Sequence, residues 1–186
     1  MDKKQLRRTI AQNKKNYSQE QLKVWSSSLL HKLEDHPAFV AAQTVLLYYS
    51  LPDEVQTHDF IERWKDTKQI ILPVVIGPTE LELRHYTGKS CLTTGAFQIE
   101  EPSGEAFIDF HAIDLAIIPG VGFDSLGNRL GRGKGFYDRL LPKINAPKIG
   151  ICFQFQVVDN IPTGPYDYPM NEIHTENGKI YPDIKK

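Results

Sequence analysis

The chain of 186 residues carries 22 lysines and arginines against 23 aspartates and glutamates, a formal net charge of −1. This balance argues against a broad nucleic-acid face, and the apolar run at residues 44–49 is far too short to span a membrane. The length suits one sizeable core, so we expect a single domain over residues 1–186 that works as a monomer, and two distant cysteines and a polar start predict a reduced, cytoplasmic protein.

Two helices are predicted at the amino terminus. Residues 3–15 form a charged, weakly amphipathic segment with Leu6 and Ile10 four positions apart. Ser18 and Gln21 then match a capping box, in which each side chain binds the other residue's backbone N–H. A second helix is therefore expected to begin after Ser18.

The next segment alternates between strands and helices. Residues 44–49 and 69–75 are apolar, strand-like runs, and Thr57 can cap a helix between them. This order is typical of a βαβ unit. Residues 81–86 alternate like a half-exposed strand, and residues 87–104 are polar enough to predict a long connection, a kind of segment that is often functional.

Later elements extend the same pattern. Residues 113–118 and 148–153 predict two more buried strands, with a helix starting near Gly135 between them. Asn177 and Gly178 lie between strand-like flanks and predict a type I′ hairpin. Together the elements predict a three-layer α/β/α fold with a mostly parallel, Rossmann-like sheet and an additional hairpin.

Residues 118–139 are the most informative segment. They combine six glycines with four basic side chains: Gly120, Gly122, Gly127, Gly131, Gly133, Gly135, Arg129, Arg132, Lys134 and Arg139. Glycines let backbone N–H groups approach a ligand, and the cations add donors that suit phosphate or carboxylate. Asp138, one turn into the following helix, can hold a Mg²⁺ ion that bridges phosphates. The segment predicts a site for a small polyanion.

Common motifs do not describe this segment. A Walker A loop is absent because Asn128 stands where its first glycine belongs, and Ser125 replaces the third glycine of a dinucleotide fingerprint. Ser125 also follows Phe123 where an esterase elbow has glycine. A solvated surface loop is the simpler alternative, but an apolar strand before the segment and a helix after it favour a phosphate loop.

A second polar turn follows the first strand. Residues 50–56 come directly after Tyr48 and Tyr49 and include Asp53 and Glu54. Because ligands gather at the carboxyl ends of parallel strands, this turn and the glycine segment should face one cleft. Spacing alone favours a solvated turn and a binding role for the two acids about equally.

These residues carry a resemblance that extends over essentially the whole chain. Residues 128–138, preceded by residues 119–124, resemble the signature of the 5-formyltetrahydrofolate cyclo-ligase family. Residues 3–7, 51–56 and 165–168 resemble further elements of that family. The resemblance implies an enzyme that uses ATP and Mg²⁺ to cyclise 5-formyltetrahydrofolate to 5,10-methenyltetrahydrofolate, with release of ADP and phosphate.

The resemblance also implies roles for individual residues. Arg132 and Lys134 would be catalytic, and Asp138 and Asp167 would hold Mg²⁺. ATP would be bound by Lys3, Lys4, Arg7, Arg129, Leu130, Gly131, Arg132, Gly133, Lys134, Gly135, Phe136 and Tyr137. The folate substrate would be bound by Leu51, Gln56, Arg132, Gly133, Lys134, Gly135 and Phe136.

Two positions depart from the family pattern. The family usually has an acidic residue at the position of Gln56, and a carboxylate accepts the pterin's N–H groups better than an amide does. Asp53 or Glu54 could compensate. The family often has tyrosine at the position of Phe136, so a hydroxyl is lost there while the ring remains.

Two other kinds of function share some of these features. An isomerase or transferase acting on a phosphosugar or a coenzyme A ester could have the same sheet, but it should place a general base at a strand end. A non-catalytic nucleotide-binding module would explain the glycine segment without the separated acids. The resemblance favours the cyclo-ligase over both.

Overall fold

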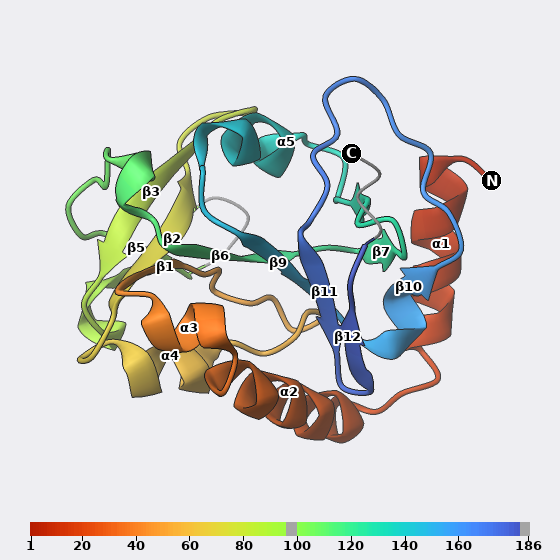
Figure 1. Cartoon of the computed structure of the whole chain (residues 1–186), viewed down its shortest axis with the longest axis horizontal. Helices are drawn as coiled ribbons and strands as arrows, with labels where there is room; N and C mark the ends of the chain where they lie inside the picture. The colour runs from red at the N-terminus through yellow and green to blue at the C-terminus, as the bar shows by residue number, and fades with distance from the viewer. Residues whose placement is uncertain (96–99, 183–186) are drawn as a thin grey trace.

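The computed structural model describes residues 1–95 and 100–182, and its centre is a seven-stranded sheet (Figure 1). In spatial order the strands are β12 (Gly178–Ile180), β11 (Glu172–Thr175), β9 (Lys148–Ile151), β6 (Leu115–Pro119), β1 (Thr44–Leu46), β2 (Gln69–Val75) and β3 (Leu81–Tyr86). The five inner strands are parallel, and β3 and β12 are antiparallel edges. The predicted, mostly parallel sheet with an added hairpin is confirmed.

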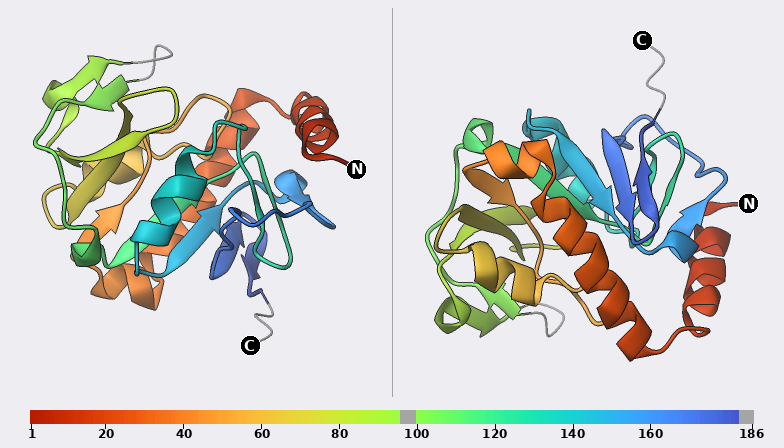
Figure 2. Two further views of the ribbon diagram at one scale, coloured as in Figure 1. Left: turned by 90° about the horizontal axis from the view of Figure 1, so that it is seen from above. Right: turned by 60° about the horizontal axis from the view of Figure 1, so that its bottom comes forward.

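Helices cover both faces of the sheet (Figures 1 and 2). The helices α2 (Gln19–Glu34), α3 (Pro37–Ala41) and α4 (His58–Trp64) pack on one face with Val45 and Leu47. The short helix α5 (Phe136–Leu140) and the 3₁₀ turn η4 (Leu141–Lys143) pack on the other face with Leu46. Strand side chains alternate between two cores because successive residues point to opposite faces. The three-layer prediction is confirmed.

Helix α1 (Lys3–Lys14) lies apart from these layers, beside β10 (Val157–Val158) in Figure 1. Its apolar residues Leu6 and Ile10 pack on Leu130 and Ile161. This contact brings the amino terminus of the chain against the glycine-rich segment. None of the helices in residues 1–95 and 100–182 is long and apolar enough to cross a membrane.

Capping explains where the first helices begin. The predicted box of Ser18 and Gln21 is present at the start of α2, and a second box, formed by Asp2 and Gln5, starts α1. Thr57 precedes α4, but its side chain does not cap the helix. Its hydroxyl instead donates to the carbonyl of Tyr48 at 2.5 Å. Thr57 therefore closes the turn at residues 50–56.

Two predicted loops contain hairpins. The connection at residues 87–104 holds the 3₁₀ turn η1 (Lys89–Cys91) and the pair β4 (Leu92–Thr94) and β5 (Glu100–Pro102), with residues 96–99 outside the described part. The glycine-rich segment holds β7 (Gly122–Asp124) and β8 (Arg129–Leu130), which form a small sheet with β10. These short strands were not predicted, because their sequences are polar and contain glycine. They form through backbone hydrogen bonds to partner strands rather than through an apolar pattern.

Two 3₁₀ turns and the turn of the last hairpin complete the fold. Two further 3₁₀ turns are η3 (Phe110–Ala112) and η5 (Gln154–Gln156). At the last hairpin Thr175 pairs with Gly178, so residues 176–177 form the turn. The prediction that Asn177 and Gly178 form the turn pair is wrong by one residue, because Gly178 already belongs to β12.

Candidate active site

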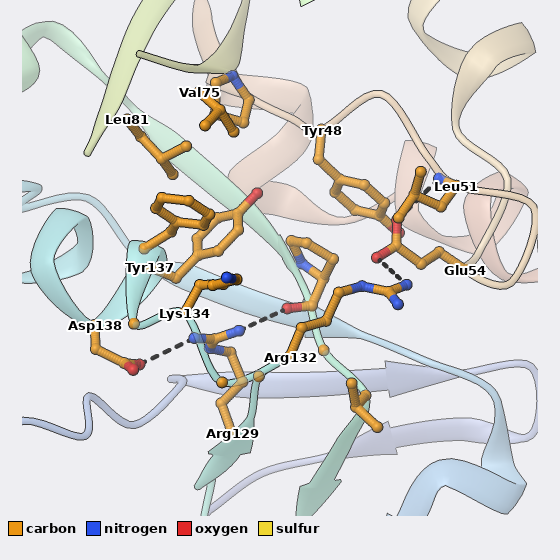
Figure 3. A pocket seen from close by; sticks show the side chains of 18 of the residues that line it. Tyr48, Leu51, Glu54, Val75, Leu81, Arg129, Arg132, Lys134, Tyr137 and Asp138 are labelled. Atoms are coloured by element: carbon orange, nitrogen blue, oxygen red, sulfur yellow. Dashed lines mark hydrogen bonds and ion pairs between the residues drawn. The ribbon is translucent and has the colours of Figure 1, made fainter. Parts of the chain in front are cut away.

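A cavity of about 360 Å³ opens at the carboxyl ends of the parallel strands (Figure 3). Pro119, at the end of β6, and Val75, at the end of β2, line it together with Tyr48 and Tyr49, which follow β1. This is the edge where open α/β sheets bind ligands. The glycine segment forms one wall and the turn at residues 50–56 forms the opposite wall.

A buried carboxylate shapes the glycine wall. Asp124 is fully buried, and its Oδ1 accepts hydrogen bonds from the backbone N–H groups of Leu126 and Asn128, both at 3.0 Å. Its Oδ2 accepts from the Asn128 side chain and from the N–H of Ile161, both at 2.9 Å. Asp124 thus folds the β7–β8 hairpin and fixes it to the chain beyond β10. Sequence reasoning missed this role because Ile161 is distant in the chain.

Two arginines hold the backbone after β8. Arg7 Nε donates to the carbonyl of Gly131 at 2.7 Å, and Arg139 Nη2 donates to the carbonyl of Lys134 at 2.6 Å. Between them Gly133 has φ of +99°, a conformation that side chains other than glycine's rarely adopt. The loop is therefore fixed in one shape against the cavity.

Arg129 is a buried cation at the base of this wall. It is only 8% exposed, and its Nη2 donates to Asp138 Oδ1 at 2.9 Å, as Figure 3 shows. Its Nη1 donates to the carbonyl of Pro119 at 3.3 Å, and its guanidinium lies 5.1 Å from the Tyr137 ring centroid. Its buried Nε has no hydrogen-bond partner within residues 1–95 and 100–182. The buried positive charge of Arg129 therefore favours the binding of an anion beside it.

A second ion pair joins helix α1 to the turn at residues 164–167 beside the cavity. Lys3 Nζ lies 2.7 Å and 2.6 Å from the two carboxylate oxygens of Asp167. Burial alone would raise the pKa of Asp167, but the bonds from Lys3 and from the Gly164 N–H hold this pKa below its ordinary value. Asp167 therefore lines the cavity as an ionised carboxylate.

The opposite wall carries a fixed pair of acids. Leu51 donates its N–H to Glu54 Oε2 at 3.0 Å, which orients the Glu54 carboxylate. Arg132 Nη2 reaches across from the glycine wall to Glu54 Oε1 at 3.0 Å and to Asp53 Oδ1 at 2.6 Å. Lys14 Nζ donates to Asp53 Oδ2 at 3.0 Å. Arg132 is thus the side chain that connects the two walls.

Aromatic and apolar side chains fill the space between the walls. Tyr48, Tyr137, Leu81 and Val75 line it, as Figure 3 shows. Burial raises the pKa values of Tyr48 and Tyr137, so both hydroxyls stay neutral at physiological pH. Glu101 of β5 also lines the cavity and accepts the Val75 N–H at 2.9 Å. The cavity combines a flat apolar slot with charged ends.

Most predicted site residues lie on the wall of this cavity. They are Lys3, Arg7, Leu51, Arg129, Gly131, Arg132, Gly133, Lys134, Gly135, Phe136, Tyr137, Asp138 and Asp167. Lys4 is exposed on α1, and Leu130 is buried beneath that helix, so neither lines it. Gln56 is half-buried beside α2, where its N–H donates to Ser26 Oγ at 3.0 Å, and it does not line the cavity either.

Sequence reasoning left several lining residues unassigned. Glu54 lines the cavity at the place where Gln56 was expected. The sequence feature that could have indicated Glu54 is its position three residues after Leu51, which lets its carboxylate accept the Leu51 N–H within the turn. Glu100 and Glu101 reach the cavity through β5. No local pattern predicts that contact, because it depends on how the β4–β5 hairpin folds back against β2 and β3.

Comparisons with known proteins show which family the chain resembles. The model of the 5-formyltetrahydrofolate cyclo-ligase family matches residues 1–176. The 5-formyltetrahydrofolate cyclo-ligase of Escherichia coli is 29% identical over 174 residues, which cover 89% of this chain and 96% of that protein. The corresponding protein of Haemophilus influenzae is 33% identical over 140 residues, covering 71% and 75%.

Solved structures give the same result. The NMR structure of Aquifex aeolicus 5,10-methenyltetrahydrofolate synthetase superposes with a TM-score of 0.88 at 33% identity, covering 100% of this chain and 95% of that one. The synthetase from Mycoplasma pneumoniae superposes with a TM-score of 0.77 at 29% identity, covering 95% and 99%. By its sequence over residues 1–176 and by its fold, the chain belongs to the 5-formyltetrahydrofolate cyclo-ligase family.

Proposed function

We propose that the chain catalyses the ATP-dependent cyclisation of 5-formyltetrahydrofolate to 5,10-methenyltetrahydrofolate, with release of ADP and phosphate. Membership of the family supports the reaction. The observation that carries the assignment of the site is the reach of Arg132 from the glycine wall to Glu54 and Asp53. One side chain thereby touches the regions that we assign to the two substrates.

The glycine wall binds the triphosphate of ATP. Phosphoryl transfer demands positioning and charge stabilisation more than covalent chemistry from the protein. Arg132 and Lys134 line the cavity and supply cations, and Arg129 supplies a buried one. The positive charge of Arg7, which holds the Gly131 carbonyl, adds to the same field. Lys3 lies close by on α1.

Asp138 and Asp167 are the residues that would hold Mg²⁺. Mg²⁺ prefers oxygen ligands and usually takes one or two carboxylates besides phosphate and water, so this donor set fits. Each acid is balanced by a cation, Asp138 by Arg129 and Asp167 by Lys3. When bound, the metal neutralises charge on the phosphates. Arg129 orients the Asp138 carboxylate, and Lys3 orients Asp167 and helps to hold its pKa below the ordinary value.

The acidic wall binds the folate. The pterin presents a row of N–H donors, and an oriented carboxylate accepts them best. Glu54 has this orientation because the Leu51 N–H fixes one of its oxygens. Gln56 contributes backbone structure through Ser26 instead. Tyr48 and Phe136 supply flat surfaces for the rings.

Arg132 changes partners during the reaction. In the structure its guanidinium pairs with Glu54 and Asp53. The γ-phosphate of ATP carries more negative charge than a single carboxylate, so it draws the Arg132 guanidinium toward the glycine wall. This movement frees the Glu54 carboxylate for the pterin. The formyl oxygen of the folate then attacks the γ-phosphorus, and ADP leaves. N10 attacks the activated formyl carbon, the C–O bond breaks, and phosphate leaves while N10 loses its proton.

The number of domains, the oligomeric state and the cellular location of the chain are further proposals. We infer that residues 1–186 act as one domain, because the seven-stranded sheet uses strands from both halves of the chain. We also infer a cytoplasmic monomer, which gel filtration with light scattering and fractionation of the cells of origin would test. The partners are then two small molecules, 5-formyltetrahydrofolate and ATP.

A direct assay tests the reaction. The methenyl product absorbs at longer wavelength than the substrate, so its formation can be followed optically. The purified chain should form it only when ATP and Mg²⁺ are both present, with one ADP released for each product molecule. No absorbance change together with no folate-dependent ADP release would overturn the proposed activity.

A further inference from the structure

Three side chains of types that bind metals lie close together between the start of α3 and strand β11. Glu172 is the first residue of β11, and α3 leads directly into the start of β1 at Thr44. Parallel strands begin at the edge opposite to their carboxyl ends, where the cavity lies. The cluster is made of His36, Glu172 and His174, and none of these three residues lines the cavity.

The three side chains converge on one point. His36 Nε2 lies 3.0 Å from Glu172 Oε2, and His174 Nε2 lies 2.8 Å from the same oxygen. The three ligand atoms all lie within 4.8 Å of one another. Glu172 and His174 share a face of β11 because they are two positions apart, and Ile173 between them points into the opposite core. Both therefore face His36.

Burial distinguishes this cluster from a chance surface grouping. His36 is 7% exposed and His174 is 3% exposed. The Glu172 side chain keeps 21% exposure, which leaves an open side for a solvent ligand. Two imidazoles and one carboxylate are the donor set of many zinc sites with an open position, and nitrogen donors are poor ligands for Mg²⁺.

We propose that His36, Glu172 and His174 bind one divalent transition metal of the Zn²⁺ class, completed by water. Ligand atoms around tetrahedral Zn²⁺ stand about 3.3–3.5 Å apart, as bonds of about 2.0–2.2 Å require. The two N···O distances need to open by only a few tenths of an ångström. The metal joins the start of α3 to β11 and stabilises the folded chain without taking part in cyclisation.

Metal binding has one structural consequence that can be measured. His36 Nδ1 accepts the N–H of Ala38 at 3.2 Å, an arrangement that requires the ring proton to lie on Nε2. A metal on Nε2 moves the proton to Nδ1, and the Ala38 contact must break. That contact is at the long end of the hydrogen-bond range. The Ala38 amide signal should therefore shift on metal binding.

The test is a titration of the full chain with Zn²⁺, followed by ¹⁵N NMR of the histidine rings with Mg²⁺ at saturation to mask the acids of the cavity. The chain has six histidines, and only the rings of His36 and His174 should shift, at one Zn²⁺ per chain. Glu172→Gln and His36→Gln should each weaken Zn²⁺ binding by about 100-fold or more, because loss of an outer-shell partner alone already costs about 10–100-fold. Cyclo-ligase turnover should stay unchanged.

His31→Gln and Cys91→Ser are the matched controls. His31 is an exposed histidine on α2, and Cys91 is a half-exposed thiol away from the cluster, so both variants should bind Zn²⁺ as the parent does. Unchanged affinity in Glu172→Gln and His36→Gln, or ring shifts confined to other histidines, would overturn the proposal. The wild-type NMR result stands even where a variant fails to fold.

Discussion

The two walls of the cavity are built by different means. The glycine wall has a fixed backbone, held by Asp124, Arg7 and Arg139 through bonds to main-chain groups. The acidic wall depends on side-chain carboxylates, whose partners are Leu51, Lys14 and Arg132. A fixed backbone suits a ligand common to many enzymes, such as a triphosphate. Side chains can exchange positions, which explains how Glu54 can take the place expected for Gln56.

Loss of Arg132 should have the largest effect, because this residue belongs to both walls. Arg132→Ala should lower kcat/KM by about 100- to 1,000-fold, the usual effect of removing a donor aimed at transition-state charge. Arg132→Lys should recover part of the loss, since it keeps the charge without the bidentate fork. Initial rates of methenyl formation measure both variants. A change below twofold would remove Arg132 from the mechanism.

The rigidity of the glycine wall can be broken at one residue. Gly133 has φ of +99°, so Gly133→Ala places a side chain in an unfavourable conformation that costs about 1–2 kcal/mol. We expect a Tm lower by about 2–8 °C and a raised KM for ATP. Gly77→Ala is the control, because its nearest atoms are 4.0 Å from the added carbon. Equal effects at both glycines would contradict a fixed phosphate loop.

The acidic wall can be tested by exchanging its two candidate residues. Glu54→Gln should raise the folate KM by about tenfold or more, because charge-assisted hydrogen bonds contribute about 1.5–3 kcal/mol. Gln56→Glu should change folate affinity by only a few-fold and leave kcat nearly unchanged. Steady-state kinetics with each substrate varied in turn separate these effects. A Gln56 effect larger than that of Glu54, or one confined to ATP, would reverse the assignment.

The metal ligands should show a more selective loss. Asp138→Asn should raise the Mg²⁺ concentration needed for half-maximal rate, since an amide oxygen is a weaker ligand than a carboxylate. Asp66→Asn, at an exposed acid beside Lys65, is the control. An unchanged Mg²⁺ titration would take Asp138 out of the metal site and leave it as the partner of Arg129 alone.

The smallest effect is expected from the link between Asp53 and its cations. Burial alone would raise the pKa of Asp53, but Arg132 and Lys14 hold it below its ordinary value of 3.8. Because the folded pKa lies below the unfolded pKa, the ion pairs stabilise the protein fully above the unfolded pKa. This contribution is lost as pH falls through the folded pKa.

The measurement is the Tm of wild type and Asp53→Asn between about pH 6 and pH 2, which extends below the ordinary pKa of an aspartate. The wild type should be slightly more stable near neutrality, by less than about 1 kcal/mol for these half-exposed pairs. The difference should vanish in acid, where Asp53 is protonated. A difference that grows in acid has the wrong sign for this explanation.

Local sequence predicted the features that depend on neighbours in the chain. The capping box of Ser18 and Gln21 and the apolar run of β6 contain their own signals. Features that depend on distant partners were missed or misplaced. Asp124 needs Ile161, Thr57 binds the Tyr48 carbonyl and does not cap its helix, and the Gln56 backbone is held by Ser26.

The coupling of the two walls by Arg132 can be measured as the affinity for 5-formyltetrahydrofolate with and without a non-hydrolysable ATP analogue and Mg²⁺. In the wild type the analogue should draw Arg132 from Glu54 and tighten folate binding by about fivefold or more. In Arg132→Ala this coupling should disappear while both ligands still bind. Equal coupling in both proteins, or none in the wild type, would contradict the account.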